Sequence, residues 1–303
     1  MILCLTALAG CGPSEISPPA FDGGRAYQYL VDQVDFGPRV PGSEPWSACR
    51  AYYVQHFSEL GFRVDSQVFS FLDPYSKTDI PLVNLIVHVQ GGETDDVPIL
   101  LLAHWDTRPR TDFHSDTSRI NEPIQGANDG ASGVAVLMEL ANLMAQQAPN
   151  ANVDLLLTDG EDWGKRGDLD YYMLGSKHFA RADGGIRGKY RFGICVDMIG
   201  DKNQQIARES YTQQYQPELN DMIWTVATKL GVTTFIDTVK ESINDDHISI
   251  NASGVPAANI IDFDYPYWHT EHDTPDKCDA VALTNVGKVL AYIVYNRSVW
   301  PNN

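Results

Sequence analysis

Apolar residues recur along the chain in two patterns, one typical of helices and one typical of strands. A helix is predicted over residues 46–60, where apolar side chains recur every three or four positions before Gly61. Three short apolar stretches then follow at 63–71, 82–90 and 97–103. Their length and their content of β-branched residues are typical of strands.

The same alternation continues to the end of the chain. A helix with Val134, Leu137, Met138 and Ala141 on one face precedes a predicted strand at 153–158. Further strands are predicted at 190–197 and 256–263, and a closing helix at 281–295. Strands interleaved with helices predict a three-layer α/β/α fold around a largely buried, mostly parallel sheet. The first two strands follow each other closely, so we expect an antiparallel hairpin at one edge that makes the sheet mixed.

The N-terminus has the pattern of a targeting segment. Ile2–Ala9 is apolar but too short to span a bilayer, and it leads into Leu-Ala-Gly-Cys at residues 8–11. This tetrapeptide resembles the bacterial lipoprotein signal, although the usual basic segment before it is missing. We therefore predict a lipoprotein-type signal at 1–11, a tether at 12–22 and a single catalytic domain at 23–303. The expected location is extracytoplasmic, in the bacterial envelope, on a lipid anchor.

The charge balance excludes some partners. The formal net charge is −18, from 40 acidic and 22 basic residues. Nucleic acid and anionic membrane surfaces both select clusters of lysine and arginine. We therefore expect no nucleic-acid partner, and membrane contact only through the N-terminal anchor.

Three cysteines remain once the signal segment is set aside. Cys195 lies in an apolar run and is expected in the core. Cys49 and Cys278 could form a disulfide, but the sequence leaves that pairing open.

Acids and histidines gather just past the predicted strands. They are His104, Asp106, Asp129, Glu161, Asp162, Asp197 and His269. In open α/β sheets, sites assemble at the carboxyl ends of the strands. Each residue alone has an ordinary structural use, such as capping a helix. Together, carboxylates and imidazoles without cysteine favour a zinc-type ion in an open catalytic site.

The segment LLLTDGEDWG, residues 155–164, places Glu161 and Asp162 side by side at the end of a strand. Two carboxylates in a partly buried place repel each other, and one becomes neutral unless a positive charge lies between them. A metal ion would keep one of them ionised as a ligand while the other works as a base.

Several short motifs carry a family resemblance. AHWDTRP, GANDGASGVAVLMELA, DGEDWG, GSKHFA, VDMIGD, NDDHI and WHTEHD occur in the order seen in zinc-dependent glutaminyl-peptide cyclotransferases, relatives of the dizinc aminopeptidases. The resemblance covers residues 23–300. The first three motifs are shared with the aminopeptidases, whereas Asn244–His247 and the Trp268-His269 pair resemble the cyclase branch.

The resemblance implies a zinc-aminopeptidase-like fold and conversion of N-terminal glutamine of peptides to pyroglutamate, with release of ammonia. It implies that Asp129, Asp162 and His269 bind one Zn²⁺ and that Glu161 is the general acid/base. It also implies that Asp197 and Asp245 form an acidic pair in a hydrogen-bond network and that Trp268 lies in the substrate pocket. Trp163 and Tyr267 are expected to add apolar walls that exclude water. For Phe263, ordinary core packing is the expectation.

Two other functions stay open. A dizinc aminopeptidase would bind one ion through His104 and Asp197 and the other through Asp162 and His269, with Asp129 as the bridge. Glu161 would then activate water, and His104 is accordingly a candidate for a second metal or for a supporting contact. A catalytically dead binding protein is disfavoured because no ligand or base position is lost.

Some polar residues have simpler explanations. Asp245 and Asp246 could merely cap a helix that begins at His247. His178 and His247 are expected to be structural, and His114 lies in a polar loop.

Overall fold

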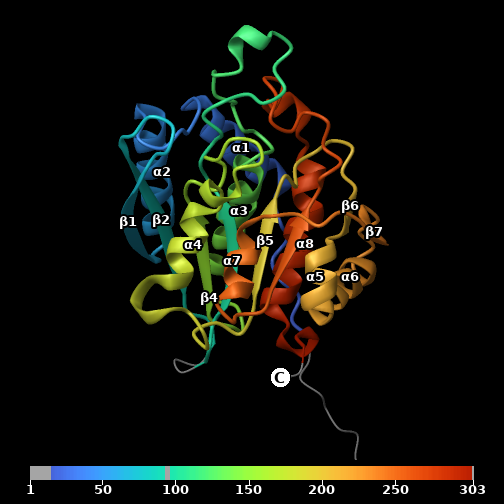
Figure 1. Cartoon of the computed structure of the whole chain (residues 1–303). Helices are drawn as coiled ribbons and strands as arrows, with labels where there is room; N and C mark the ends of the chain where they lie inside the picture. Colours follow the sequence, from blue (N-terminus) through green and yellow to red (C-terminus); the bar gives the residue numbers. More distant parts are fainter. Residues whose placement is uncertain (1–14, 93–95, 302–303) are drawn as a thin grey trace, which may run out of the picture.

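A computed structural model describes residues 15–92 and 96–301 of the chain. Its centre is a six-stranded sheet in the order β1-β2-β4-β3-β5-β8 (Figure 1). The strands are β1 (Arg63–Leu72), β2 (Asp79–Val89), β3 (Ile99–His104), β4 (Val153–Thr158), β5 (Gly193–Asp197) and β8 (Ala257–Ile261). β3, β4, β5 and β8 run parallel, while β1 and β2 form an antiparallel hairpin at one edge. The predicted mixed sheet is confirmed.

Helices cover both faces of the sheet. One face carries α1 (Gly23–Asp35), α2 (Glu44–Glu59), α3 (Ala131–Gln146) and α8 (Ala280–Tyr295). The other carries the shorter α4 (Leu174–Arg181) and α7 (Asp246–Ala252), which lie in front of the sheet in Figure 1. Beyond β8 lie α5 (Ser210–Tyr215), α6 (Pro217–Lys229) and a small parallel pair of β6 (Ile206–Arg208) and β7 (Phe235–Val239). The predicted three layers are therefore present.

The side chains of strand β3 contribute to two hydrophobic cores, one on each face of the sheet. All six of its residues are buried. Because successive side chains point to opposite faces, Leu101 packs in the core under α3 while Leu100 and Leu102 pack under α4 and α7. A strand covered on both faces needs a continuous apolar run, which is the pattern seen here.

Gly133 lets α3 lie directly on the sheet. A methyl group at this position would lie 2.4 Å from the carbonyl oxygen of Val196 in β5. Contact this close brings the N-terminal turn of α3 next to the ends of β3 and β5, where the candidate site lies.

The segment before α1 lies along the domain. Asn296 accepts from the backbone N–H of Ile16 at 2.8 Å and donates to its carbonyl at 2.9 Å. Phe21 is buried against Gly287 of α8. Residues 15–22 thus belong to the folded unit and are not a free tether. The predicted signal at 1–11 lies outside the described residues.

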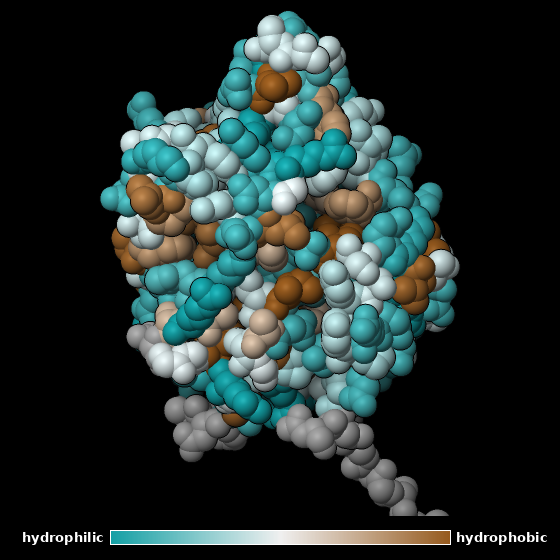
Figure 2. Space-filling view, in the orientation of Figure 1, coloured by the Kyte–Doolittle hydropathy of each residue, from teal (hydrophilic) through white to brown (hydrophobic). Residues whose placement is uncertain are grey.

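The face of the molecule seen in Figure 2 is mainly polar. Figure 2 shows hydrophilic residues over most of this face, with apolar residues in small separate groups. Within residues 15–92 and 96–301, no helix combines the length and the apolar character needed to cross a bilayer.

Cys49, Cys195 and Cys278 are all buried and unpaired. The core position of Cys195 is confirmed, whereas a bridge between Cys49 and Cys278 is not formed. Cys49 faces the core from α2, while Cys278 lies beside Asp201 in the loop before α8.

Candidate active site

The predicted site residues meet at the carboxyl edge of the sheet. His104 and Asp197 end β3 and β5, Glu161 and Asp162 follow β4, and Asp129 lies in the turn before α3. All of these except His104 line a cavity of about 60 Å³, whose lining includes Asp129, Glu161, Asp162, Asp197, Asp245, Trp268 and His269. Parallel strands bring their ends together, so residues far apart in sequence converge here.

Asp129, Asp162 and His269 form a set of metal-ligand type, with one ligand atom from each lying within 4.8 Å of the others. His269 Nε2 lies 3.7 Å from Asp129 Oδ2 and 3.3 Å from Asp162 Oδ1. Asp129 Oδ2 and Asp162 Oδ2 are buried without a hydrogen-bond partner. Buried carboxylate oxygens are seldom left unpaired, and two of them beside an imidazole nitrogen fit a divalent cation such as zinc.

Two residues that the sequence analysis missed hold this set in place. Asp112 Oδ2 lies 3.1 Å from His269 Nδ1, which leaves Nε2 facing the other two ligands. The buried Arg108 donates to Asp162 Oδ1 at 2.6 Å and lies 2.7 Å from Asp112. Partners of this kind orient metal ligands. Their only signal was a run of polar residues after the strand that ends at His104.

Two further buried acids support the loops. Asp106 accepts from the backbone N–H groups of Glu161 at 3.1 Å and Asp162 at 3.3 Å. Asp273 accepts from the N–H groups of Asn128 at 2.8 Å and Asp129 at 3.1 Å. The ligand-bearing turns are therefore held by side chains from other segments.

The backbone is strained at the site itself. His269 and Met198, neither of them glycine, have φ of 55° and 47°. A left-handed conformation costs such residues roughly 1–2 kcal/mol, and strain of this kind clusters at active sites. Gly130 has φ of 102°, and a methyl group there would lie 2.7 Å from the Asp106 carbonyl oxygen.

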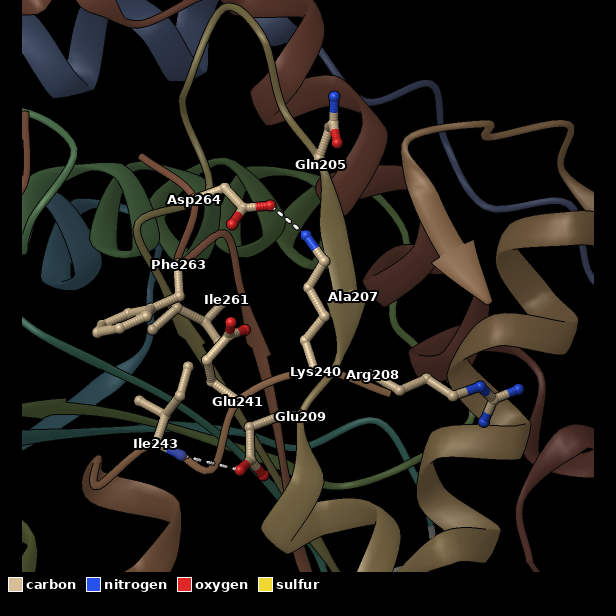
Figure 3. A pocket seen from close by; sticks show the side chains of 10 residues that line it. All are labelled: Gln205, Ala207, Arg208, Glu209, Lys240, Glu241, Ile243, Ile261, Phe263 and Asp264. Carbon is tan, nitrogen blue, oxygen red and sulfur yellow. Dashed lines mark hydrogen bonds and ion pairs between the residues drawn. The ribbon is translucent and has the colours of Figure 1, made fainter. Parts of the chain in front are cut away.

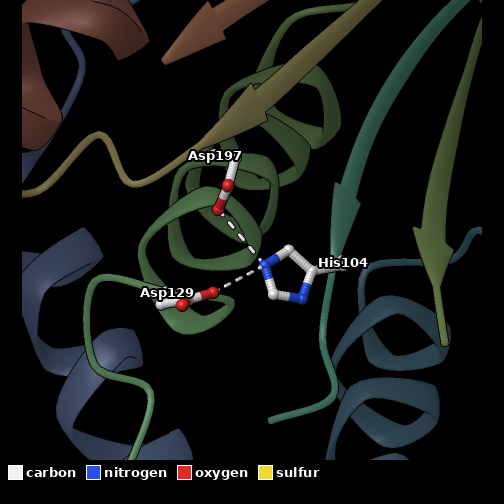
Figure 4. Close-up of side chains that lie close together, drawn as sticks. All are labelled: His104, Asp129 and Asp197. Carbon is white, nitrogen blue, oxygen red and sulfur yellow. Dashed lines mark hydrogen bonds and ion pairs between the residues drawn. The ribbon is translucent and has the colours of Figure 1, made fainter. Parts of the chain in front are cut away.

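A second set consists of His104, Asp129 and Asp197 (Figure 4). His104 Nε2 lies 3.2 Å from Asp129 Oδ1 and 3.2 Å from Asp197 Oδ1. The imidazole points directly between the two carboxylates and hydrogen-bonds to Asp197. The two sets share Asp129. The first set has carboxylate oxygens without a hydrogen-bond partner, whereas in the second set His104 hydrogen-bonds to Asp197.

The surroundings shift the pKa values of the adjacent Glu161 and Asp162 in opposite directions, as the sequence suggested. Burial, together with the charge of Asp162, raises the pKa of Glu161 well above its ordinary value. Burial also opposes ionisation of Asp162, but His269 and Arg108 outweigh it and lower the pKa of Asp162. Neighbouring carboxyl groups with pKa values pushed apart are typical of a proton-transfer residue beside a permanently ionised one.

Asp197 and Asp246 are also shifted. Burial raises the pKa of Asp197 to about 7, even though His104 opposes the shift. Burial and the nearby Asp245 raise the pKa of Asp246 to about 6, and its carboxylate accepts from the Thr158 hydroxyl. Asp246 is fully buried and was not predicted as a site residue.

Asp245 both caps a helix and lines the cavity. Its side chain accepts from the N–H of Asp246 at the start of α7 and from Asn259 Nδ2 at 2.7 Å. The capping alternative is therefore present in the structure, with the helix beginning at Asp246 rather than at His247. Asp245 also lines the cavity that Glu161 and Asp197 line.

The set of aromatic residues that line the cavity differs from the predicted set. Trp268 lines the cavity and stacks on His269, with ring centroids 3.9 Å apart. Phe263 is not a core residue: it is 37% exposed, and its ring packs on Trp268 at the cavity edge. Tyr172, absent from the prediction, also lines the cavity.

Trp163 and Tyr267 do not line the cavity, which corrects the prediction for both. The indole N–H of Trp163 instead donates to Asp73 at 2.9 Å. Tyr267 packs edge-on against Tyr265.

The remaining histidines lie outside the cavity. His178 stacks on Phe69 with ring centroids 4.0 Å apart, and His247 is buried 3.3 Å from Glu209. His114 accepts from the N–H of Asp116 at 2.9 Å. These contacts agree with the structural roles predicted for the first two.

Comparison with known sequences identifies the family. Residues 84–294, more than half of the chain, match the sequence profile of Peptidase family M28. The chain belongs to this family. As an M28 member it is a zinc-dependent type of enzyme, which agrees with the ligand set above.

Solved structures similar to this fold include both glutaminyl cyclases and an aminopeptidase precursor. A glutaminyl cyclase from Bacteroides thetaiotaomicron, bound to N-acetylhistamine, is 36% identical, with a TM-score of 0.86 over 92% of this chain and 99% of that one. A leucine aminopeptidase precursor from the same organism is also 36% identical, with a TM-score of 0.87 over 93% and 99% of the two chains.

The curated relatives likewise include a cyclotransferase-like protein and an aminopeptidase. The Bos taurus glutaminyl-peptide cyclotransferase-like protein is 23% identical over 285 residues, covering 84% of this chain and 70% of its own length. The chain spans only about a third to two fifths of the length of several other curated relatives, including Aminopeptidase YwaD of Bacillus subtilis.

Removing Arg108 should destabilise this M28 fold strongly. Arg108→Met would remove the buried guanidinium that pairs with Asp162, which is buried, and with Asp112, which is partly buried. Breaking a buried pair in this way costs about 3–5 kcal/mol. Denaturant unfolding of the chelator-treated protein measures the loss. Arg119→Met, which removes an exposed partner of Glu122, is the control and should barely shift the midpoint. Equal midpoints for both variants would show that Arg108 does not compensate these charges.

Proposed function

We propose that this protein is a glutaminyl-peptide cyclotransferase. The reaction converts the N-terminal glutamine of a peptide to pyroglutamate and releases ammonia. The observation that carries the proposal is that Asp245 lines the same small cavity as Glu161 and Asp197. A peptidase needs metal ligands and a base, and Asp245 is neither. A cyclase must also hold the substrate's own amine against its side-chain amide, which needs a further acceptor. The similarity to bacterial glutaminyl cyclases supports this assignment.

The chain's own residues supply binding and proton transfer. Asp129, Asp162 and His269 would hold zinc, which when bound supplies Lewis-acid polarisation of the amide carbonyl. Glu161 accepts the proton of the attacking α-amine and returns it to the departing nitrogen as ammonia leaves. Its raised pKa suits both directions of transfer. Asp197 and Asp245 accept hydrogen bonds from the amine and so orient it.

Exclusion of water matters because hydrolysis of the side-chain amide to glutamate competes with ring closure. Trp268 and Phe263 line the cavity and pack on each other, with ring centroids 5.1 Å apart. Their position at the cavity edge covers the bound terminal residue and limits the entry of water.

The second candidate is a dizinc aminopeptidase. The observation that favours it is the set of His104, Asp129 and Asp197, which supplies three ligand atoms within 4.8 Å of one another. Aminopeptidases are also among the similar proteins. The cyclase is preferred because Asp245, which is neither a ligand nor a base in a peptidase, lines the same cavity as Glu161 and Asp197.

The variant Asp245→Asn distinguishes a helix-capping role of Asp245 from a catalytic role. Asparagine caps helices about as well as aspartate, so a residue that only caps α7 tolerates the change. We expect the variant to fold and bind zinc but to cyclise a Gln-peptide at least about 100-fold more slowly, because the amine loses its anionic partner. Ammonia release and zinc content measure both effects.

Asp279→Asn is the matched control, because Asp279 caps α8 in the same way, with its side chain accepting from the N–H of Val281. This variant should keep full activity. Near-normal cyclisation by Asp245→Asn would reduce Asp245 to a cap and return the aminopeptidase to equal standing.

A further inference from the structure

The segment that carries Asp245 depends on its neighbours for its shape. Residues 240–245 connect β7 to α7 without regular secondary structure, and the last three of them, Ile243, Asn244 and Asp245, all line the cavity. An irregular segment has no hydrogen-bond ladder of its own, so its backbone groups are satisfied by other parts of the chain. The residues that make those contacts therefore set the position of Asp245.

A single carboxylate, that of Glu209, contacts the chain on both sides of Asp245. Figure 3 shows the Glu209 side chain directed at Ile243, whose N–H donates to Oε1 at 3.1 Å. The other oxygen, Oε2, lies 3.3 Å from Nε2 of His247 in α7. Ile243 precedes Asp245 by two residues and His247 follows it by two. Glu209 thus contacts both ends of the short stretch whose middle residue lines the cavity.

A second connection joins Glu209 to Asp245 through side chains. The Thr212 hydroxyl donates to Glu209 Oε2 at 2.9 Å and accepts from the backbone N–H of Asn259 at 3.2 Å. The side chain of Asn259 in turn donates to Asp245 Oδ2 at 2.7 Å. Thr212 and Asn259 are fully buried, so these hydrogen bonds are shielded from water.

The charge state of Glu209 suits a residue that accepts from several donors. Its side chain is 2% exposed and also accepts from the N–H groups of Tyr211 at 2.7 Å and Thr212 at 2.6 Å. Burial opposes ionisation, but His247 and these N–H groups outweigh it and lower the pKa of Glu209 to about 2. The carboxylate is therefore ionised at neutral pH, and both of its oxygens act only as acceptors.

The simpler explanation is that Glu209 only caps α5. Its bonds with Tyr211 and Thr212 are cap bonds at the start of that helix. A cap of α5 does not require the bond to Ile243 or the contact with His247, which both belong to the chain around Asp245. Capping thus accounts for only some of the contacts.

We propose that Glu209 is a positioning residue that fixes Asp245 for the reaction. The inference rests on the proposed function, in which Asp245 accepts a hydrogen bond from the substrate's amine. Glu209 does not line the cavity, so it acts through residues 243–247 and through Asn259 rather than on the substrate.

The first test is Glu209→Gln in the zinc-loaded full chain. Glutamine keeps the shape of the side chain but replaces one acceptor oxygen by an NH₂ group, so the donors on that side lose their acceptor. We expect kcat for cyclisation of a Gln-peptide to fall about 10- to 100-fold with unchanged zinc content, because a small displacement of an orienting group has an effect of this size. Ammonia release is measured at a temperature at which circular dichroism shows every variant folded.

Glu139→Gln is the matched control. Glu139 is also a buried carboxylate, but it joins α1 to α3 by pairing with Arg25 at 2.6 Å, and it does not line the cavity. This variant should have a lowered unfolding midpoint and an unchanged kcat. The same result for Glu209→Gln would reduce Glu209 to a helix cap and overturn the proposal.

A double-mutant cycle shows whether Glu209 acts through Asp245. In the Asp245→Asn background, Glu209→Gln should lower kcat/KM by less than about threefold, because residues that act through one another are not additive. The full loss in that background would show independent action and overturn the proposal. If Glu209→Gln does not fold, Thr212→Val provides the same cycle, since it removes the hydroxyl that joins Glu209 to Asn259.

Failure of the proposed function would appear in the wild-type chain, as release of a free amino acid without ammonia. The cyclase assignment would then be wrong. The same cycle, measured on the amino acid released, would still decide whether Glu209 acts through Asp245. Additive effects on ammonia release would instead overturn the role of Glu209 and leave the cyclase assignment intact.

Discussion

His269→Ala is expected to lose its bound zinc and, with it, all measurable turnover. His269 is the one nitrogen ligand of a three-residue set, and its ring is oriented by Asp112. Loss of a supporting partner alone typically lowers metal affinity about 10- to 100-fold, so loss of the ligand should exceed that. Metal analysis after dialysis and competition with a chelator of known affinity measure the change.

His178→Ala is the control for this experiment. His178 stacks on Phe69 and does not line the cavity, so this variant should retain zinc and activity. Full zinc occupancy in His269→Ala would show that the ligand assignment is wrong.

Glu161→Gln should keep the zinc and lose turnover by a factor of about 10²–10⁴, the usual size of a general-base contribution. Glutamine has nearly the same shape but cannot accept and return a proton. Asp162→Ala, one residue further on, should lose both metal and turnover, because it removes a carboxylate that has one unpaired oxygen and lies 3.3 Å from His269 Nε2 through the other. Substantial turnover by Glu161→Gln, with ammonia release and zinc content measured on the same sample, would remove Glu161 from the proton-transfer role.

Much of the fold was predictable because burial leaves a periodic pattern in the sequence. β3 and β4 are buried on both faces, and the apolar runs at 99–103 and 155–157 reflect this burial. The ends of these strands could then be located, and with them His104, Glu161 and Asp162. Their convergence follows from the geometry of parallel strands, so the sequence indicated a site before any distance was available.

The supporting contacts could not be predicted in the same way. Arg108 and Asp112 lie in an irregular loop, where no periodicity says which way a side chain points. Trp163 looked like a pocket residue because it follows the two acids, but it bonds to Asp73, 90 positions away in the sequence. A hydrogen-bond partner so distant leaves no local signal.

Asp245 shows a third limit. The sequence offered two functions for it, cap or catalytic partner, and the residue that caps the N-terminus of α7 also lines the cavity. One residue is therefore placed for both functions, and sequence patterns carry no signal that separates them.

The most direct measurement is the identity of the product. The zinc-loaded full chain is incubated with a peptide that begins with glutamine and, separately, with one that begins with leucine, and the products are followed by mass spectrometry and by an ammonia assay. The account predicts that the glutamine peptide loses one ammonia and keeps all its residues, while the leucine peptide is unchanged. Release of free leucine or free glutamine, without ammonia, would contradict it.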